Sequence, residues 1–322
     1  MNTKYFSGII LLLSATFIIT LNSCQKKADA KTSVEDNTRV SGEMHPPYTP
    51  SAEWNNYWYQ GLAELTSYTL QQSRYGEIHK GTVVNVFVTE DFSKSKQVKL
   101  DNYNAGDDKL PVMKINQSIK FNTGIYPYSM MMSSFSPTDL NNYPHAVKTT
   151  NSVQEWCGMI YYQLNNRNNK YDIEQRSYFE SEGDKDIKLE VVLTEDEIWN
   201  LIRLAPDKLP SGEQIILPGS LYLRLAHKPI EPVKAKLSLR DAEGMKIYQI
   251  EYPSLKRTLS ITFEPIFPYK ITGWEDTYPG LDGKMLTTVA SKNKEMMLDY
   301  WSKHTNNDLP LREQLGLPKE FQ

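Results

Sequence analysis

The chain has 322 residues, with 36 Lys and Arg against 39 Asp and Glu, so its formal net charge is −3. Such mild acidity provides no basic surface for nucleic acid and no polybasic patch for an acidic membrane, which argues against both kinds of partner. Twenty tyrosines and six tryptophans beside only 16 glycines favour strands, because aromatic side chains pack well on pleated surfaces. We therefore expect an all-β or β-rich α+β protein.

The first 24 residues have the pattern of a bacterial lipoprotein signal. Lys4 precedes a short apolar run that starts near Gly8, and the small residue Ser23 stands directly before Cys24. A membrane-spanning helix needs ~20 apolar residues, and Ser and Thr interrupt this run. A plain secretion signal usually ends in an A-x-A-like site instead. We expect residues 1–23 to be removed and Cys24 to become a lipid-bearing N-terminus.

The predicted anchor places the protein in the cell envelope. One acyl chain holds a membrane only marginally, so the expected product resembles the multiply acylated anchor of bacterial lipoproteins. Gln25 follows the lipid-bearing residue in place of aspartate, which by resemblance to enterobacterial sorting favours the outer membrane. The segment 26–29 is no clear surface-export signal. We therefore expect the periplasmic face in preference to the cell surface.

Residues 24–50 are polar and contain three prolines near their end, with too little apolar surface to offset the entropy of ordering them. They are predicted to be a disordered tether. Residues 51–322 follow as a single β-rich domain, in which two similar halves could meet near 185–210. If Cys24 carries lipid, Cys157 has no intrachain partner. We expect Cys157 to be buried, where cysteine behaves as a small hydrophobe, although a nucleophile–base pair with His145 is an alternative.

Alternation with period two predicts strands along most of the domain. The Asn-rich segment 165–169 tolerates positive φ, as a hairpin turn between two of these strands requires. The expected strands are 65–71, 82–88, 113–121, 124–134, 146–156, 157–164, 171–179, 220–226, 233–239, 246–252, 258–263, 269–275 and 285–298.

Three short helices are expected, one before the strands, one among them and one after them. Ser51 is suited to cap a helix that ends near Trp58 and carries its aromatic side chains on one face. Residues 194–197 have the spacing of a capping box, and the helix that follows should end at about Leu204, before Pro206. A terminal helical turn is expected over 311–315.

Ten or more strands with one central helix must bury their apolar faces, which predicts a large antiparallel sheet, curved or partly open and barrel-like. Such a sheet has a concave face, and small ligands bind in concave apolar sites. An aromatic residue or methionine on this face is more often ordinary core than ligand contact. The residues expected to line it are Tyr126, Tyr128, Met130, Met132, Trp156, Tyr162 and Trp274.

The sequence lacks the common catalytic motifs. It has no glycine-rich phosphate loop and no G-x-S-x-G elbow, and its five histidines lack metal-ligand spacing, so we expect no cofactor and no metal. Paired carboxylates are harder to exclude, because a glycosidase needs only two of them across a cleft. Glu155 beside Trp156 and Glu275 beside Trp274 are the candidates. A solvated strand end is the alternative role for each.

Several segments resemble a group of uncharacterised envelope lipoproteins from Bacteroidota, whose members often carry the name "septum formation inhibitor Maf". The name implies a cytoplasmic nucleotide pyrophosphatase of α/β fold with an early S-x-S-x-R-R loop. This chain has no adjacent arginine pair, begins with an export signal and is dominated by strand patterns. The resemblance therefore implies an envelope lipoprotein and not that activity. The segments that carry it are 57–59, 74–77, 87–92, 121–129, 154–158, 163–165 and 177–180.

The sequence favours a non-enzymatic outer-membrane lipoprotein that binds or presents a hydrophobic or polymeric envelope ligand, either a lipid or a glycan. A hydrolase that acts on glycans through paired carboxylates is the alternative from another class. A purely structural envelope partner without a pocket is the third.

Overall fold

The computed structural model describes residues 48–101 and 105–319. The predicted signal, the lipidation site Cys24 and nearly all of the predicted tether lie outside these residues. The described residues belong to one unit, His45–Gln322.

Sixteen strands join into one sheet in the described part of the chain, and the fold is mainly β, as predicted. All neighbouring strands are antiparallel except β10 and β11, which are parallel. The order is β10-β11-β12-β13-β14-β15-β16-β1-β2-β4-β5-β6-β7-β8-β9, with β3 paired to β2. The bounds are β1 Ala63–Arg74, β2 Glu77–Ser93, β3 Val98–Lys99, β4 Lys109–Thr123, β5 Tyr126–Pro137, β6 Lys148–Glu155, β7 Gly158–Arg167, β8 Lys170–Arg176, β9 Lys185–Glu190, β10 Leu193–Thr194, β11 Gly212–Leu217, β12 Val233–Ala242, β13 Met245–Tyr252, β14 Arg257–Phe263, β15 Ile271–Pro279 and β16 Met285–Leu298.

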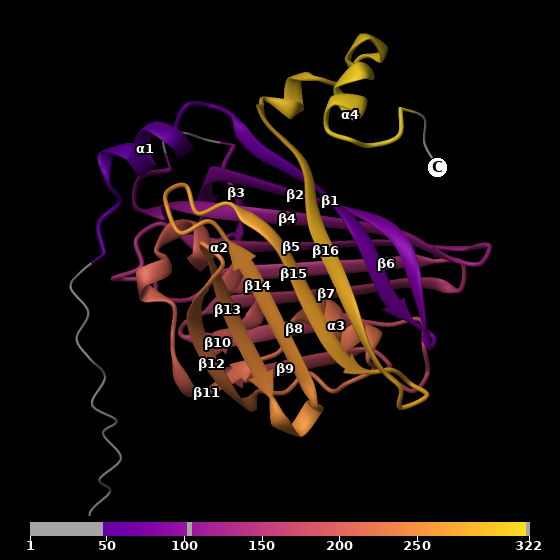
Figure 1. Ribbon diagram of the computed structural model, residues 1–322. Helices are drawn as coiled ribbons and strands as arrows, with labels where there is room; N and C mark the ends of the chain where they lie inside the picture. Colours follow the sequence, from indigo (N-terminus) through magenta and orange to yellow (C-terminus); the bar gives the residue numbers. More distant parts are fainter. Residues whose placement is uncertain (1–47, 102–104, 320–322) are drawn as a thin grey trace, which may run out of the picture. The chain divides into compact units, whose positions relative to one another are not determined.

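The sheet consists of two meanders joined in its middle, where β1 pairs with β2 on one side and with the last strand, β16, on the other. Its two edges are β9 and β10, and only Val191 and Val192 separate these strands along the chain. Because a residue spans at most ~3.6 Å, this link holds one end of each edge strand close to the other. The sheet is therefore curved almost into a barrel, with β12–β16 in front of β4–β9 (Figure 1).

The helices are short, and two of them lie inside the curve of the sheet (Figure 1). None of the described helices is long and apolar enough to cross a membrane. Their bounds are α1 Ala52–Trp58, α2 Glu195–Leu204, α3 Ser220–Leu225 and α4 Pro310–Gln314, and the 3₁₀ turns are η1 Gly106–Asp108, η2 Pro206–Lys208, η3 Pro253–Leu255, η4 Tyr300–Ser302 and η5 Asn306–Asp308.

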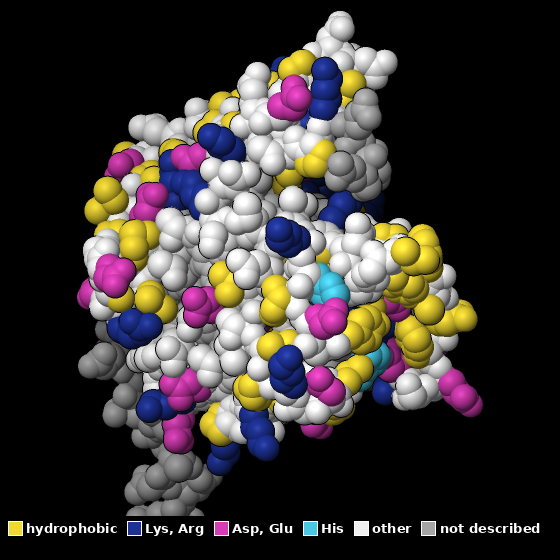
Figure 2. All heavy atoms as spheres, turned by 45° about the vertical axis from the view of Figure 1, so that its right-hand side comes forward, with side chains coloured by type: hydrophobic (Ala, Val, Ile, Leu, Met, Phe, Trp, Pro, Cys, Tyr) yellow, Lys and Arg dark blue, Asp and Glu magenta, His cyan; other side chains and the backbone are white. Residues whose placement is uncertain are grey.

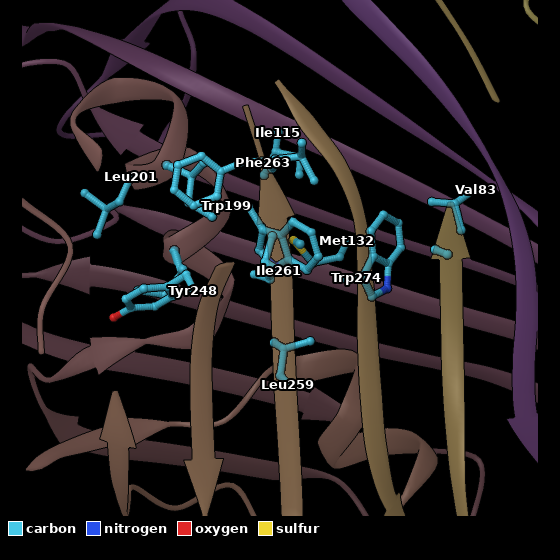
Figure 3. Close-up of a cluster of buried hydrophobic side chains, with 14 of the residues drawn as sticks. Val83, Ile115, Met132, Trp199, Leu201, Tyr248, Leu259, Ile261, Phe263 and Trp274 are labelled. Atoms are coloured by element: carbon cyan, nitrogen blue, oxygen red, sulfur yellow. The ribbon is translucent and has the colours of Figure 1, made fainter. Parts of the chain in front are cut away.

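Helix α2 begins where predicted, since the Glu197 carboxylate accepts a hydrogen bond from the Thr194 N–H at 2.9 Å. All ten of its residues are buried, because the sheet wraps around it. The ring of Trp199 lies 5.1 Å from that of Trp274 on β15. Figure 3 shows Trp199 among side chains of front and rear strands, including Ile261 and Met132. The helix therefore fills the concave side of the sheet.

Several charged residues of α2 are held in this interior by buried partners. Arg203 donates to both oxygens of Glu64 on β1, at 2.6 and 2.7 Å. Tyr57 of α1 donates to the same carboxylate at 2.6 Å, so α1, α2 and β1 meet at one ion pair. Buried charges are tolerated only when they are paired and hydrogen-bonded.

The C-terminal segment lies on the other face of the sheet. Leu315, just after α4, is buried in a small cluster with Ala63 and Leu65 of β1 and Val88 of β2. The predicted terminal helical turn is thus confirmed as α4, packed on the middle strands.

One expected strand is wrong. Residues 220–226 were expected to be a strand, because Leu221, Leu223 and Leu225 alternate with other residues, but Ser220–Leu225 is the helix α3. Five of its six residues are buried, so an alternating pattern is compatible here with a short helix enclosed by the sheet. The two-residue strands β3 and β10 were not predicted, and neither were β9 and β11, since the mostly exposed residues of β9 and of the first part of β11 carry little hydrophobic signal.

Candidate functional site

A hollow of about 230 Å³ lies between α3 and the concave face of β6 to β9. We call it the Arg224 pocket. The strands, α3 with the turn after it, and the loop between β8 and β9 all contribute residues to its lining. It is lined by Asn151, Ile160, Tyr162, Gln175, Ser181, Glu182, Lys185, Ser220, Leu223, Arg224, His227, Lys228, Pro229 and Ile230.

Three buried side chains of this pocket each hold a polar atom without a hydrogen-bond partner among the described residues. These atoms are Oδ1 of Asn151, Oγ of Ser220 and Nε of Arg224. The residues are only 3%, 4% and 8% exposed. A buried polar atom left unsatisfied costs about 1–3 kcal/mol. Their convergence on one hollow is the strongest sign of a binding site in the described part of the chain.

The guanidinium of Arg224 is held in place by two acidic residues. Its Nη1 donates to Glu182 at 3.0 Å and its Nη2 lies 3.4 Å from a carboxylate oxygen of Glu155. The ring of Phe179 packs 4.8 Å from the same group. Burial lowers the pKa of Arg224, Glu182 and Glu155 act in the opposite direction, and Arg74 nearby lowers it further. With both Nη atoms engaged, the Nε–H is the group of this guanidinium that has no partner among the described residues.

His227 completes this network through an unusual backbone conformation. It follows the C-terminus of α3 at φ 50°, in the left-handed region that normally favours glycine. Its Nδ1 lies 2.7 Å from the Glu182 carboxylate, which accepts the hydrogen bond. Residues held in such sparsely populated conformations cluster at ligand sites.

Three aromatic residues, two exposed and one half-buried, lie near the pocket, since Glu155 and Phe179 beside two of them contact Arg224. Trp156 follows Glu155 in the turn between β6 and β7 and is 64% exposed, while Tyr178 precedes Phe179 and is also 64% exposed. The ring of Tyr126, at the start of β5, lies 5.8 Å from that of Trp156. We call these three residues the aromatic rim. Figure 2 shows hydrophobic side chains gathered on one side of this face of the molecule.

Four of the five aromatic residues predicted from the sequence lie at this end of the sheet. Tyr162 lines the pocket, Tyr126 and Trp156 belong to the rim, and Tyr128 links them to the core, since its ring lies 5.5 Å from that of Tyr126. Trp274 lies elsewhere, 7% exposed against α2. Met130 and Met132 are likewise buried core residues.

The structure does not bring the two predicted catalytic carboxylates together. Glu155 lies on β6, where its side chain is 4% exposed beside Arg224. Glu275 is exposed on β15, and β16, β1, β2, β4 and β5 lie between these strands in the sheet. The acidic residue that shares the Arg224 guanidinium with Glu155 is Glu182.

Cys157 is exposed, so the expectation that it is buried is wrong. Residues 156 and 157 form the turn between β6 and β7, whereas the sequence suggested that two strands meet there directly. The thiol therefore projects at a hairpin tip. In the described residues, no group of three His, Cys, Asp or Glu side chains could hold a metal ion.

The interior of the sheet holds a second polar cluster but little space. Arg257 of β14 donates to both oxygens of Glu195, at 2.6 and 2.8 Å, and to Asp276 at 2.7 and 2.9 Å. Asp196 beside them accepts the Ser220 N–H, and burial, with the charge of Glu195, raises its pKa to about 7 although Ser220 and Arg257 act in the opposite direction. The cavity at this cluster is about 70 Å³, room for roughly two waters at ~30 Å³ each.

A third, more open hollow of about 600 Å³ lies at the opposite ends of β6 and β7, beside His145. Burial acts to lower the pKa of His145, but the hydrogen bond to Glu197 at 3.0 Å and the negative charge of Glu197 together outweigh burial and raise it. Of its lining residues, only Gln97 holds a buried polar atom without a partner. This hollow is therefore a weaker candidate for a binding site than the Arg224 pocket.

The sequence analysis missed Asn151, Glu182, Ser220 and Arg224, the residues that make the pocket polar. One signal for them was present, because Arg224 is a charge within the apolar segment 220–226. A charge in a buried segment must find partners. No family model, curated protein or solved structure matches this chain.

Proposed function

We propose that this protein is a non-enzymatic, lipid-anchored envelope protein that binds a polymeric envelope ligand in the Arg224 pocket. The observation that carries the proposal is that three residues with unpartnered polar atoms, Asn151, Ser220 and Arg224, line one hollow, with exposed aromatic side chains on the adjoining segments. Ligand sites combine apolar and aromatic walls with a few placed polar groups in this way.

A carrier of long acyl chains is less well supported. The concave face is filled by α2 and α3, and the interior cavity of about 70 Å³ is too small for such a chain. The polymeric alternative is favoured because a polymer can bind at an open mouth through one unit, without being enclosed.

The anchor part of the proposal rests on the sequence around Cys24 and on the resemblance to Bacteroidota envelope lipoproteins. Metabolic palmitate labelling should give a labelled protein in the outer-membrane fraction, and Cys24→Ser should remove the label. Unlabelled full-length chain in the cytosolic fraction of wild-type cells would overturn this part.

Binding is tested on the lipidated protein purified from native membranes. Material that co-purifies with the wild type should be lost from Asn151→Ala. The matched control is Asn165→Ala, because Oδ1 of Asn165 on β7 is also buried and unpartnered but does not line the pocket. Identical co-purified material in all three proteins, or none in the wild type, would contradict binding at this site.

Two further variants distinguish a glycan hydrolase from the proposed binding protein. If turnover of an envelope glycan is found and Glu182→Gln or Glu155→Gln abolishes it while the melting temperature is kept, the protein is an enzyme. We expect no such turnover.

A further inference from the structure

The chemistry of the Arg224 pocket selects among ligand classes. If the proposed binding function holds, we infer that the group bound there is a polyhydroxylated ring, a sugar unit of an envelope glycan, and neither an anionic headgroup nor an acyl chain. Four properties of the pocket carry this inference: its unpartnered atoms, its charge, its size and its rim.

The unpartnered atoms require a ligand that both donates and accepts hydrogen bonds. Arg224 offers an N–H donor, Asn151 offers a carbonyl acceptor, and the Ser220 hydroxyl can act either way. A sugar hydroxyl both donates and accepts, so neighbouring hydroxyls of one ring can satisfy all three. An ionised carboxylate or phosphodiester has only acceptor atoms at its charged group and would face the Asn151 oxygen unpaired.

The charges of the pocket do not by themselves select an anion. Lys185 and Lys228 line the pocket and form no ion pair with described residues. Arg224, however, is already paired with Glu182 and Glu155, and the Glu182 carboxylate lines the same hollow. An anion bound in this hollow would share it with the Glu182 carboxylate, which repels it, whereas a neutral hydroxylated ring would not be repelled.

The volume of the Arg224 pocket and the residues around it agree with a sugar ring as the ligand. The volume of about 230 Å³ corresponds to roughly eight waters at ~30 Å³ each, which suits one small polar ring. Trp156 and Tyr178 at the rim offer flat apolar surfaces on which the less polar faces of adjoining rings can pack. An acyl chain would leave all three unpartnered atoms unsatisfied.

The test is calorimetric titration of the detergent-solubilised mature protein with neutral oligosaccharides of glucose, galactose, mannose and N-acetylglucosamine. Inorganic phosphate and phosphatidylglycerol vesicles are titrated in parallel. At least one saccharide should bind, and Asn151→Ala should weaken its affinity tenfold or more. Asn165→Ala should leave the affinity within twofold, and the melting temperatures of both variants show whether they fold.

Two results would overturn the inference. One is that no saccharide binds at millimolar concentration; the other is that phosphate or the vesicles bind with the Asn151 dependence expected of the saccharide. Analysis of the native co-purified material separates the two proposals. Material that Asn151→Ala loses but that contains no sugar rejects the ligand class and keeps the binding function, whereas material unaffected by the variant rejects the function itself.

Discussion

At the scale of single residues, the sheet encloses several charged side chains together with the residues that pair with them. Glu64 with Arg203, and Glu195 and Asp276 with Arg257, form buried ion pairs with two-point geometry. Such pairs add little net stability relative to apolar residues, but removal of one partner leaves a buried charge unpaired. Asp196 is the exception, because no cation contacts it.

Asp196 should make stability depend on pH. Burial and Glu195 raise its pKa to about 7 in the folded protein, so between about pH 4 and 7 the folded chain binds more protons than the unfolded chain, and stability falls as pH rises. Asp196→Asn should remove this loss of stability. At 1.36 kcal/mol per pKa unit, the free energy of unfolding should rise by up to about 4 kcal/mol at pH 8 and change little at pH 4. Urea unfolding of both proteins at pH values between 4 and 8 measures this difference.

His145 provides the control for that prediction. Its raised pKa also gives stability that is present below the ordinary histidine pKa and lost as pH rises through the folded value. His145→Gln should remove only this contribution and leave the Asp196 effect in place. An Asp196→Asn gain that is the same at pH 4 and pH 8 would show that the carboxyl is not protonated in the fold.

The Glu64–Arg203 pair gives a second prediction at this scale. Arg203→Met should destabilise the protein by about 3–5 kcal/mol, because Glu64 would remain buried without its cation. In Arg203→Met/Glu64→Gln the remaining amide is neutral and can still accept from Tyr57, so most of that loss should be recovered. Urea unfolding of both proteins at pH 7 measures the difference. Equal instability of the two variants would contradict the unpaired charge as the cause.

At the scale of elements, hairpin turns and short loops position the candidate site. Gly158 starts β7 where the β8–β9 loop crosses it, and a Cβ there would lie 2.6 Å from Cγ of Tyr178. The absence of a side chain at Gly158 thus allows Tyr178 and Phe179 to cover the turn. Phe179 in turn contacts Arg224 and His227.

Gly158→Ala should therefore strain this loop and destabilise the protein by about 1–3 kcal/mol, as overpacking does. Tyr178→Ala removes the ring that clashes, so the double variant should be less destabilised than the sum of the single variants. A double-mutant cycle by urea unfolding measures this coupling. Additive effects would show that the two residues do not contact each other.

At the scale of the whole molecule, the position of each strand in the sheet should determine its protection. β1 has a hydrogen-bonded neighbour on both sides and lies near the middle, whereas β9 is an edge strand whose side chains alternate between exposed and half-buried. Edge strands leave half of their backbone groups unpaired. Charged residues at Lys185, Asp186, Lys188 and Glu190 are suited to discourage pairing of β9 with other chains.

Amide hydrogen exchange measured by mass spectrometry should follow this order. Peptides from β1, β2 and β16 should exchange most slowly. Peptides from the edge strand β9, and from the start of β11 that the two-residue β10 leaves unpaired on one side, should exchange fastest among the strands, because local opening needs less energy at an edge. Equal protection of β9 and β1 would indicate that the edge is covered in solution, by another copy or by a further part of the chain.

The sequence by itself determined the strand-rich class, the capping-box helix and the short helices at either end of the domain. These features depend on residues within a few positions of one another, such as Thr194 with Glu197. Local sequence patterns gave wrong predictions where the surrounding sheet decided the conformation or the burial of a residue. The alternating segment Ser220–Leu225 became a helix inside the sheet, and Cys157 became an exposed turn residue.

Only the tertiary structure decided which side chains share the Arg224 pocket. Asn151, Glu182 and Arg224 are remote in sequence, and they meet because the sheet curves and returns its last meander beside β1. The sequence could suggest aromatic residues at this end, since four of them lie there, but not the polar atoms beneath them. The physical reason is that curvature depends on the packing of the whole sheet around α2 and α3, which no short segment encodes.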